Sequence, residues 1–411
     1  MKKLVCLALA LLLVGAMAVG CLPKPADPAP APAPAEPKPA DPVAPAEPAE
    51  IENPTVEQLL EMDWAKIEEY AKKEGEVVFF AWHDEDFFQK LCMAFTEKYG
   101  IKATFVFADH NAGVDKALAE KDGAVGSFDV MKVGGETTKT TIAAGIYAGP
   151  ILAKMENGDK LDPGLSARQE GVEHQGYLVP LHLNQTGLLY NPAKVENPPQ
   201  TFAELEAWID ANPKKFGFCI PDKGGSGQAF VHAVIGATTG GLDQYYGDEE
   251  CDPAKLEKWS AVWEWINARK DKMTFTASNN DSLARMNQGE LDLVVAWDDN
   301  AYRTMKNGEL FKEAKLYIPE FGMTGGGDTV GVMKNAAHPA AAMLLVNFLT
   351  SDQGQQMFID EMNAFPARVD LPTAHSLIDP AEMQKYRIAW TPACYKAQFI
   401  ADFTQYVLMG G

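Results

Sequence analysis

Aromatic rings and carboxylates occur together at two places in the sequence, and this combination suits a bound cation. Trp297 is followed directly by Asp298, and Asp84 lies two residues after Trp82. An indole face attracts a cation electrostatically, and a carboxylate accepts charge-assisted hydrogen bonds from an ammonium group. These four side chains predict a site for an organic cation. The alternative is that both tryptophans belong to a core and that Asp84 only favours a helix N-terminus.

A glycine-rich segment could supply hydrogen-bond donors to an anionic part of the ligand. Residues 218–230 read FCIPDKGGSGQAF, which predicts a strand, a glycine loop with Ser226 and then a helix. Free N–H groups at a helix start, together with a serine hydroxyl, bind phosphates and carboxylates. The P-loop spacing is absent, and such turns also occur without a ligand. Glu136, which follows another predicted strand, could line the same site or only form a turn.

Motifs that bind metals or perform covalent catalysis are missing from the sequence. The histidines show no HExxH spacing and the cysteines show no CxxC pair, so we expect neither a zinc site nor a cofactor. A GxSxG nucleophile elbow is also absent. Paired carboxylates, Asp298 with Asp84 or Glu136, keep an extracytoplasmic hydrolase or transferase as an alternative. We favour a binding protein over an enzyme.

The elements that position these residues alternate along the chain as in an α/β fold. A helix is predicted from the Thr55 cap to Gly75, and another lies between the predicted strands 76–82 and 101–107. Strands are also predicted at 127–133, 178–190, 216–221 and 291–297. Mostly parallel sheets follow from this alternation, and their ligands bind beyond the carboxyl ends of the strands. The predicted strand ends are 82–86, 134–138, 223–228, 297–300 and 320–328.

The start of the chain has the order of a secretion signal. Lys2 and Lys3 precede an apolar run over residues 4–18, and small residues lead to Cys21. The segment 1–20 resembles a bacterial lipoprotein signal, in which the following cysteine is lipidated and becomes the mature N-terminus. An ordinary cleaved signal or a short membrane anchor is the alternative, but the run is shorter than the ~20 residues of a spanning helix. We therefore expect export and anchoring through Cys21.

A Pro/Ala-rich segment follows, and the rest of the chain is large enough for two lobes. Residues 21–52 contain almost only Pro, Ala, Asp, Glu and Lys after the cysteine, so they cannot form a core and are predicted to be a tether. The remaining 55–411 exceed the usual size of one core. Loss of Lys2 and Lys3 changes the formal charge from −21 to −23. This charge argues against nucleic acid as a partner and is compatible with a cationic solute.

Four cysteines remain in the folded part of the chain, and export permits disulfides between them. They are Cys92, Cys219, Cys251 and Cys394. Four cysteines allow three sets of pairs, and the sequence does not decide between them. Our first expectation is a bond between Cys219 and Cys251.

Four segments of the sequence resemble the family 1 extracellular solute-binding proteins. Residues 331–354, GVMKNAAHPAAAMLLVNFLTSDQG, resemble a strand, turn and helix that end in a phrase such as NFLLSPEGQ in that family. Residues 364–368, AFPAR, match its YPA-type turn. Residues 180–191, PLHLNQTGLLYN, resemble a crossover strand, and 198–213, PPQTFAELEAWIDANP, resemble the segment that follows it. The resemblance covers roughly 75–368.

This resemblance implies a type II periplasmic-binding-protein fold, in which two doubly wound α/β lobes are joined by a hinge of two crossover strands. Lobe 1 is expected from 55–181 and 323–370, and lobe 2 from 182–322 and 371–411. The implied function is a monomeric substrate-binding lipoprotein that captures a small solute between the lobes. It would deliver the solute to the membrane permease of an ABC importer. A sensory lipoprotein that binds the same solute is a further alternative.

The resemblance also bears on the class of solute. In the polyamine receptors of this family, Trp297 stands where a stacking tryptophan is found and Asp328 stands near a carboxylate that binds an amine. Gly326 falls where those receptors have another tryptophan. The iron receptors have a tyrosine pair at the place of Trp297 and Asp298, so ferric iron is less favoured. A polyamine or a thiamine-like cation is the preferred solute.

Overall fold

The computed structural model describes residues 51–82, 84–248, 250–372 and 377–410. The predicted signal, the predicted lipidation site Cys21 and nearly all of the predicted tether lie outside these residues. The fold below is that of the unit Glu52–Gly411. Within the described part, no helix combines the length and the apolar character that a membrane crossing requires.

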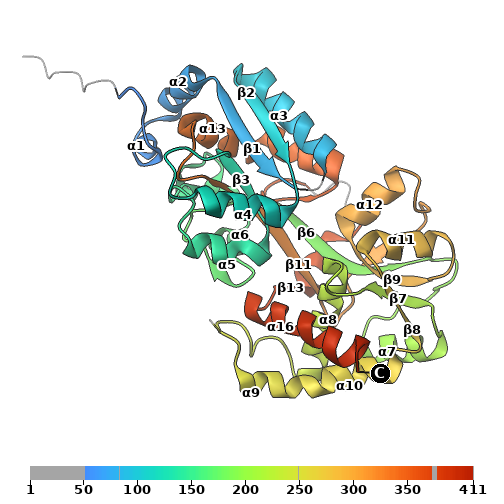
Figure 1. The fold of residues 1–411 in the computed structure, drawn as a ribbon. Coiled ribbons are helices and arrows are strands. Elements are labelled where there is room, and N and C mark those ends of the chain that lie inside the picture. Colours follow the sequence, from blue (N-terminus) through green and yellow to red (C-terminus); the bar gives the residue numbers. More distant parts are fainter. Residues whose placement is uncertain (1–50, 83, 249, 373–376, 411) are drawn as a thin grey trace, which may run out of the picture. The chain divides into compact units, whose positions relative to one another are not determined.

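One mixed sheet runs through both lobes of this unit (Figure 1). Its strands lie in the order β2, β1, β3, β11, β6, β9, β7 and β8. Their bounds are Lys102–Phe107, Glu76–Ala81, Val130–Val133, Met323–Val332, Val179–Tyr190, Leu293–Trp297, Phe216–Cys219 and Met273–Thr276, in that order. The pairs β1–β2, β1–β3, β7–β8 and β7–β9 are parallel. The sheet therefore contains two parallel groups of three strands, one for each lobe.

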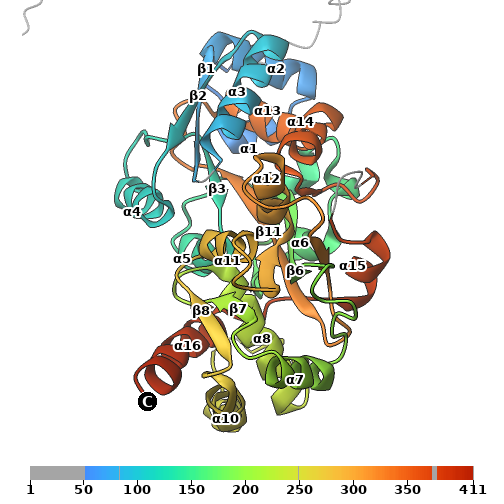
Figure 2. The ribbon, with the colours of Figure 1, turned by 90° about the vertical axis from the view of Figure 1, so that its right-hand side faces the viewer.

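The long strands β6 and β11 join the two parallel groups and form the hinge (Figure 2). They are antiparallel to each other, and each is also antiparallel to a neighbour: β11 to β3 and β6 to β9. Three short strands lie beside them: β10 (Lys315–Tyr317) and β12 (Phe365–Pro366) on β6, and β13 (Arg387–Ile388) on β11. This arrangement is the type II periplasmic-binding fold that the family resemblance implies.

The core of lobe 1 combines two segments that are far apart in the sequence. It contains α1 (Val56–Leu60), α2 (Trp64–Glu74), α3 (Glu85–Tyr99), α4 (His110–Glu120) and α5 (Gly135–Ala143) from the first segment. The second segment adds α13 (Pro339–Leu349) and α14 (Asp352–Met357). Every residue of α13 from Ala340 to Leu349 is buried, and the helix packs on α2, β1 and β3. Lobe 1 is thus completed only by the later part of the chain.

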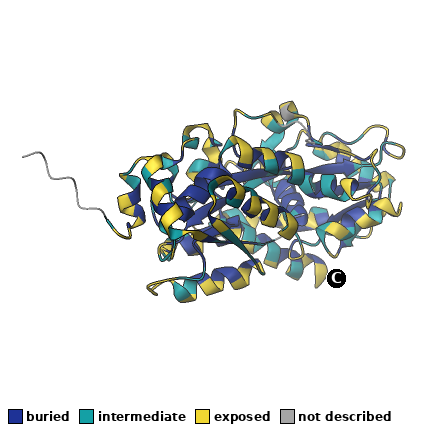
Figure 3. Cartoon of the chain, turned by 90° about the horizontal axis from the view of Figure 1, so that it is seen from above, coloured by how far each residue is buried: buried dark blue, intermediate teal, exposed yellow. Residues whose placement is uncertain are grey.

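Lobe 2 is organised around α8 (Gly225–Thr239), most of which is buried. Around it lie α7 (Phe202–Ala211), α9 (Pro253–Leu256), α10 (Ser260–Arg269), α11 (Asn279–Asn287), α12 (Asp298–Lys306) and α16 (Ala393–Phe403). The chain between α5 and β6 forms α6 (Pro163–Ala167), β4 (Arg168–Gln169) and β5 (Val172–Glu173). Helix α15 (Pro380–Tyr386) precedes β13. Figure 3 shows buried strands in the middle and exposed outer faces on the helices.

The strands and the first αβ unit agree with the sequence predictions, and three details do not. The helix predicted from Thr55 to Gly75 is two helices, because the Asp63 carboxylate accepts a hydrogen bond from Lys66 N (2.8 Å) and starts a new one. The segment 320–328 is not a strand end, since β11 begins within it at Met323 and continues to Val332. The expected bond between Cys219 and Cys251 is wrong, because Cys219 is a buried thiol that donates to the Ile220 carbonyl, whereas Cys251 has Cys394 as its neighbouring thiol.

Candidate functional site

The strand ends of the two lobes meet through an ion pair between Asp84 and Arg303. Asp84 follows β1 in lobe 1, and Arg303 lies on α12 directly after β9 in lobe 2. Asp84 has a left-handed backbone (φ +48°), which aspartate tolerates better than most residues, and its side chain makes no capping bond to α3. The carboxylate therefore bridges the cleft instead of capping the helix.

Trp82 lies in this cleft, but its ring already has partners from the protein. The His110 ring stacks on the indole with 3.8 Å between centroids. The ammonium of Lys132 lies 4.0 Å from the ring centroid. A cation over Trp82 is thus present in the structure, and it belongs to the protein itself. The role of Trp82 towards a solute stays a prediction.

Asp328, on the hinge strand β11, binds that same lysine. Its carboxylate lies 2.6 Å from Lys132 Nζ and 3.2 Å from His182 Nε2. The Lys132 side chain is completely buried, so its charge needs a close counter-ion. Asp328 therefore holds an internal amine, and a contact with a solute amine is still a prediction.

Glu136, near the start of α5, faces the same part of lobe 1. Its carboxylate lies 2.8 Å from His110 Nδ1. Desolvation acts to raise the pKa of Glu136, but the hydrogen bond from His110 and the charge of Lys396 outweigh it, and the pKa is lowered. Glu136 therefore favours its ionised form. Its carboxylate contacts the same His110 ring that stacks on Trp82.

In lobe 2, Trp297 lies over the first residue of α8. A Cβ atom on Gly225 would stand 2.9 Å from Cζ2 of the indole, so only glycine allows this approach. Among the described residues, neither an aromatic ring nor a cation lies over the Trp297 ring. Trp297 and Trp82 are both partly exposed, but the Trp297 ring lacks the His110 and Lys132 partners that cover Trp82.

The glycine loop predicted to bind an anion has an internal acceptor. Asn279 Oδ1, from α11, accepts hydrogen bonds from the Ser226 hydroxyl (2.8 Å) and from Ser226 N (3.2 Å). The Ser226 side chain is fully buried. Both donors that the sequence suggested for an anion are thus engaged, and an anion contact at Ser226 stays a prediction.

Asp298 begins α12 and is almost completely buried, at 1% exposure. Its carboxylate accepts hydrogen bonds from Leu377 N (3.0 Å) and from the Asn363 amide (3.4 Å). It thereby links α12 to two segments near the hinge. These two hydrogen bonds give the carboxylate a structural role. A direct contact with a solute is still a prediction.

Glu170 and Lys396 form a second bridge, which the sequence did not indicate. Glu170 lies between β4 and β5 beneath α5, where Gly135 leaves room for its side chain, and Lys396 is on α16. Glu170 Oε1 lies 2.8 Å from Lys396 Nζ. The other oxygen, Oε2, is buried and has no hydrogen-bond partner among the described residues. Burial raises the pKa of Glu170, although the charge of Lys396 opposes the shift.

Trp390 fills the space beside Gly326 on the hinge. A Cβ on Gly326 would lie 3.2 Å from Trp390 Nε1 and 3.3 Å from Asn184 Oδ1. Asn184 Oδ1 is buried and unpaired within the described part of the chain. Lys396 Nζ lies 4.6 Å from the centroid of the Trp390 ring. The floor of the cleft therefore contains an indole, an amide oxygen and an unsatisfied carboxylate oxygen.

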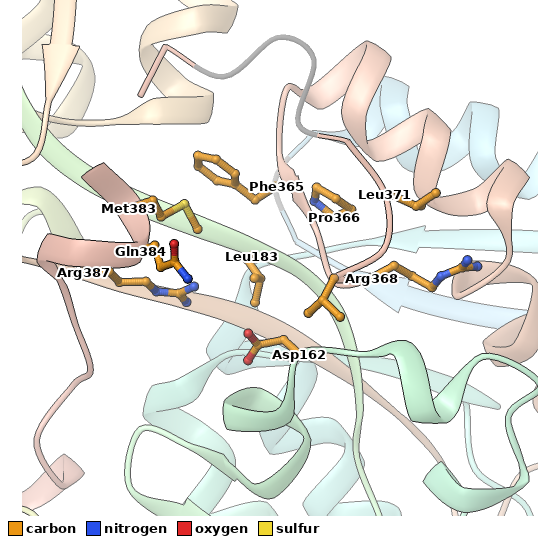
Figure 4. Close-up of a pocket in the computed structure, with 10 residues that line it drawn as sticks. Asp162, Leu183, Phe365, Pro366, Arg368, Leu371, Met383, Gln384 and Arg387 are labelled. Carbon is orange, nitrogen blue, oxygen red and sulfur yellow. The ribbon is translucent and has the colours of Figure 1, made fainter. Parts of the chain in front are cut away.

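A well-defined cavity lies on the other face of the hinge. It has a volume of about 470 Å³ and is lined by Asp162, Leu183, Phe365, Met383 and Arg387, among others (Figure 4). Neighbouring residues of a strand point to opposite faces, so Leu183 and Asn184 face different sides. None of the predicted site residues lines this cavity. We therefore place the site at the strand ends, where the charged and aromatic side chains converge, and not in this cavity.

A smaller cavity adjoins the ion pair between Asp84 and Arg303. Its volume is about 180 Å³, and Arg303 and Asn300 of α12 line it together with Asn280 of α11. Within the described residues, no group of three or more His, Cys, Asp or Glu side chains is arranged to hold a metal ion.

Comparison with known proteins shows similarity to bacterial solute-binding proteins. Residues 90–387 match the family model described as bacterial extracellular solute-binding protein. A relative, the Fe(3+)-binding periplasmic protein of Serratia marcescens, is 23% identical over 73% of this chain and 80% of its own length. A maltooligosaccharide ABC transporter solute-binding lipoprotein of Streptococcus pneumoniae is 21% identical over 70% of each chain.

Solved structures show the same fold at low sequence identity. The spermidine/putrescine ABC transporter substrate-binding protein of Streptococcus pneumoniae has a TM-score of 0.63 and 14% identity, and the match covers 80% of this chain and 99% of that one. Iron-bound HitA from Pseudomonas aeruginosa has a TM-score of 0.57 and 19% identity, with 80% and 98% covered. These neighbours bind different solutes, so the likeness concerns the fold alone.

Proposed function

The chain belongs to the bacterial extracellular solute-binding protein family, and on this premise we propose that its solute is an organic cation, such as a polyamine or a thiamine-like molecule. It is the substrate-binding protein of an ABC transporter. In the proposed mechanism the solute first contacts one lobe and meets the second when the hinge closes. Binding then shifts the population towards the closed form, which docks on the permease.

The charge balance of the cleft is the observation that carries this proposal. The site contains five carboxylates, those of Asp84, Glu136, Glu170, Asp298 and Asp328. Three ammonium or guanidinium groups compensate them, from Lys132, Arg303 and Lys396. The carboxylates exceed the cationic groups by two, so a bound cation would reduce this excess, and the unpaired Oε2 of Glu170 is a buried acceptor for it.

The aromatic side chains support the same class of solute. Trp297 offers a partly exposed indole from lobe 2, and Trp390 lies beside Gly326 on the hinge. In the polyamine receptors that the sequence resembles, a tryptophan stands at the place of Gly326. Here an indole from another part of the chain is found next to that place. Lys396 already lies over the Trp390 ring, so Trp297 is the indole that remains for a solute. An indole and an excess of carboxylates are the groups that a desolvated organic cation needs.

An enzyme with paired carboxylates receives less support. The Asp298 carboxylate accepts two hydrogen bonds and is almost fully buried, and Asp84 is bound to Arg303. A general acid or base must reach the substrate with a proton to exchange. These two groups are engaged in contacts that hold elements together, so binding without chemistry is the simpler function.

A thermal-shift screen of the full chain tests the proposed solute class. We would compare spermidine, putrescine, thiamine and choline with maltotriose, phosphate and ferric citrate. A ligand at 100 times its dissociation constant should stabilise the fold by roughly 2.7 kcal/mol, or several degrees. Stabilisation by one of the cations alone supports the proposal. Stabilisation only by the sugar, the anion or iron would refute the cation while leaving the binding function in place.

We further propose that the protein is exported and anchored through a lipid on Cys21, as a monomer beside its permease. The support is the order of Lys2, Lys3, the apolar run and Cys21, together with a relative that is itself a lipoprotein. Detergent-phase partition of the mature protein measures the anchor. The wild type should enter the detergent phase, and Cys21→Ser should remain in the aqueous phase. Equal partition of both proteins would contradict lipidation.

A further inference from the structure

Two of the four cysteines of the folded part lie against each other in lobe 2. Cys251 precedes α9 and Cys394 belongs to the first turn of α16. The Cys394 side chain acts on the Cys251 thiol, and both side chains are partly exposed at the edge of the same hydrophobic core. By contrast, Cys92 is buried in α3, and Cys219 donates a hydrogen bond to the Ile220 carbonyl (3.3 Å). The last two are thus separate core thiols.

The residues that follow the two cysteines are hydrogen-bonded to each other. Asp252 N donates a hydrogen bond to the Tyr395 hydroxyl (3.0 Å), and that hydroxyl donates to the Asp248 carboxylate. Tyr395 is buried and packs edge-on against Tyr245, with 5.0 Å between ring centroids. Lys255 also binds Asp248. This polar network fixes the segment 248–255 against the start of α16, so the approach of the thiols does not depend on the cysteines alone.

We propose that Cys251 and Cys394 form a disulfide in the exported protein. The bond rests on the export that we propose above, because thiols outside the cytoplasm are oxidised. The oxidant is a protein disulfide of the exporting compartment. The thiolate of one cysteine attacks it to give a mixed disulfide, and the second thiolate then displaces the oxidant as a dithiol. Two electrons and two protons pass from the two thiols to the oxidant.

The disulfide has a consequence for the cleft. Cys394 stands two residues before Lys396 on α16, and Lys396 bridges to Glu170 and lies over Trp390. A covalent bond at the start of α16 therefore restrains the helix that carries this cation. Burial, and then the neighbouring thiol of Cys394, raise the pKa of Cys251 to about 12. The thiolate is thus scarce at neutral pH, and exchange with a small disulfide should be slow compared with exchange through an enzyme.

Peptide mapping of the purified full chain tests the bond. The protein is prepared from the exporting compartment, denatured with iodoacetamide present and digested without reductant. We expect a cross-linked peptide containing Cys251 and Cys394, two hydrogens lighter than the sum of its parts, with Cys92 and Cys219 alkylated. Cys251→Ser should abolish this species, and the matched control Cys219→Ser should retain it. A natively folded chain with alkylated Cys251 and Cys394 would overturn the proposal, as would a cross-link to another cysteine.

A second measurement separates this proposal from the solute-binding function. The melting temperature of the wild type should fall on reduction, and that of the double variant Cys251→Ser with Cys394→Ser should not change. An equal response of the two proteins would contradict the disulfide. The cation screen is run on the same oxidised and reduced samples. If the cross-linked peptide is absent but a cation binds, only the disulfide is rejected. If the cross-linked peptide is present but no cation binds, only the proposed solute is rejected.

Discussion

Arg303 of α12 and Asp84 at the start of α3 form an ion pair that connects the two lobes across the cleft. Neither residue lies on a hinge strand, so this contact exists only when the lobes approach each other. The Asp84 side chain is 12% exposed and that of Arg303 is 41% exposed. A pair in this setting is worth up to about 1 kcal/mol. It therefore adjusts the balance of open and closed forms without fixing it.

Replacement of Arg303 by alanine should open the cleft of the free protein. Loss of up to about 1 kcal/mol raises the ratio of open to closed forms by about fivefold at most. Small-angle X-ray scattering should show a larger radius of gyration, and cation affinity should fall by the same factor. Arg285→Ala is the control, because Arg285 pairs with Asp281 on its own helix. A similar expansion in both variants would contradict a role for the bridge.

Replacement of Trp297 by alanine should weaken cation binding at least tenfold while leaving the empty protein nearly as stable as the wild type. The indole is partly exposed and lies over Gly225, so its loss removes a binding surface more than a core side chain. Isothermal titration calorimetry gives the affinity. Trp208→Ala, on the far helix α7, removes a partly buried indole and should leave affinity unchanged. A large loss of stability in Trp297→Ala would instead assign this indole to the core.

The pH dependence of binding should depend on Glu170. Its pKa is raised in the folded protein by burial, so its ionisation costs stability, which is lost as pH rises above the ordinary value of 4.5. A bound cation favours the ionised form, and affinity should therefore fall on acidification, by up to about tenfold per pH unit. Titrations in two buffers of different ionisation enthalpy should detect proton release. Glu170→Gln should remove both effects, and Glu173→Gln should keep them.

Acid should destabilise the fold through His232, which is fully buried in α8. Its Nε2 accepts a hydrogen bond from Thr391 N (3.3 Å), so that nitrogen carries no proton in the native state. Burial, and then the charge of Lys396, lower the pKa of His232 to about 3 from an ordinary 6.5. The stability of the neutral form is complete above pH 6.5 and is lost below it, by up to about 1.4 kcal/mol per pH unit.

Urea unfolding at pH 7, 6 and 5 checks this prediction. The difference in unfolding free energy between the wild type and His232→Gln should shrink as the pH falls. A constant difference over this range would mean that the protonation of His232 is not linked to folding.

The sequence predicted the strands of this fold because long apolar runs alternate with helical spacing, as in β1, α3 and β2. It predicted Trp82, Asp84 and Trp297 as site residues because each lies at the carboxyl end of a strand. The partners of these residues were not predictable, since Arg303, Lys132 and Asn279 come from other elements. Glu170 lies between two-residue strands that carry no periodicity. Trp390 and Lys396 follow the segment that resembles the family.

Lobe 1 closes its core with α13, although its first strand lies near the start of the described chain. A chain that passes through a secretion channel with its N-terminus first must therefore carry its early strands across before their packing partner arrives. All of lobe 2 up to β10 emerges in the meantime. For the export that we propose, the chain order delays native folding of lobe 1 until most of the polypeptide has crossed the channel.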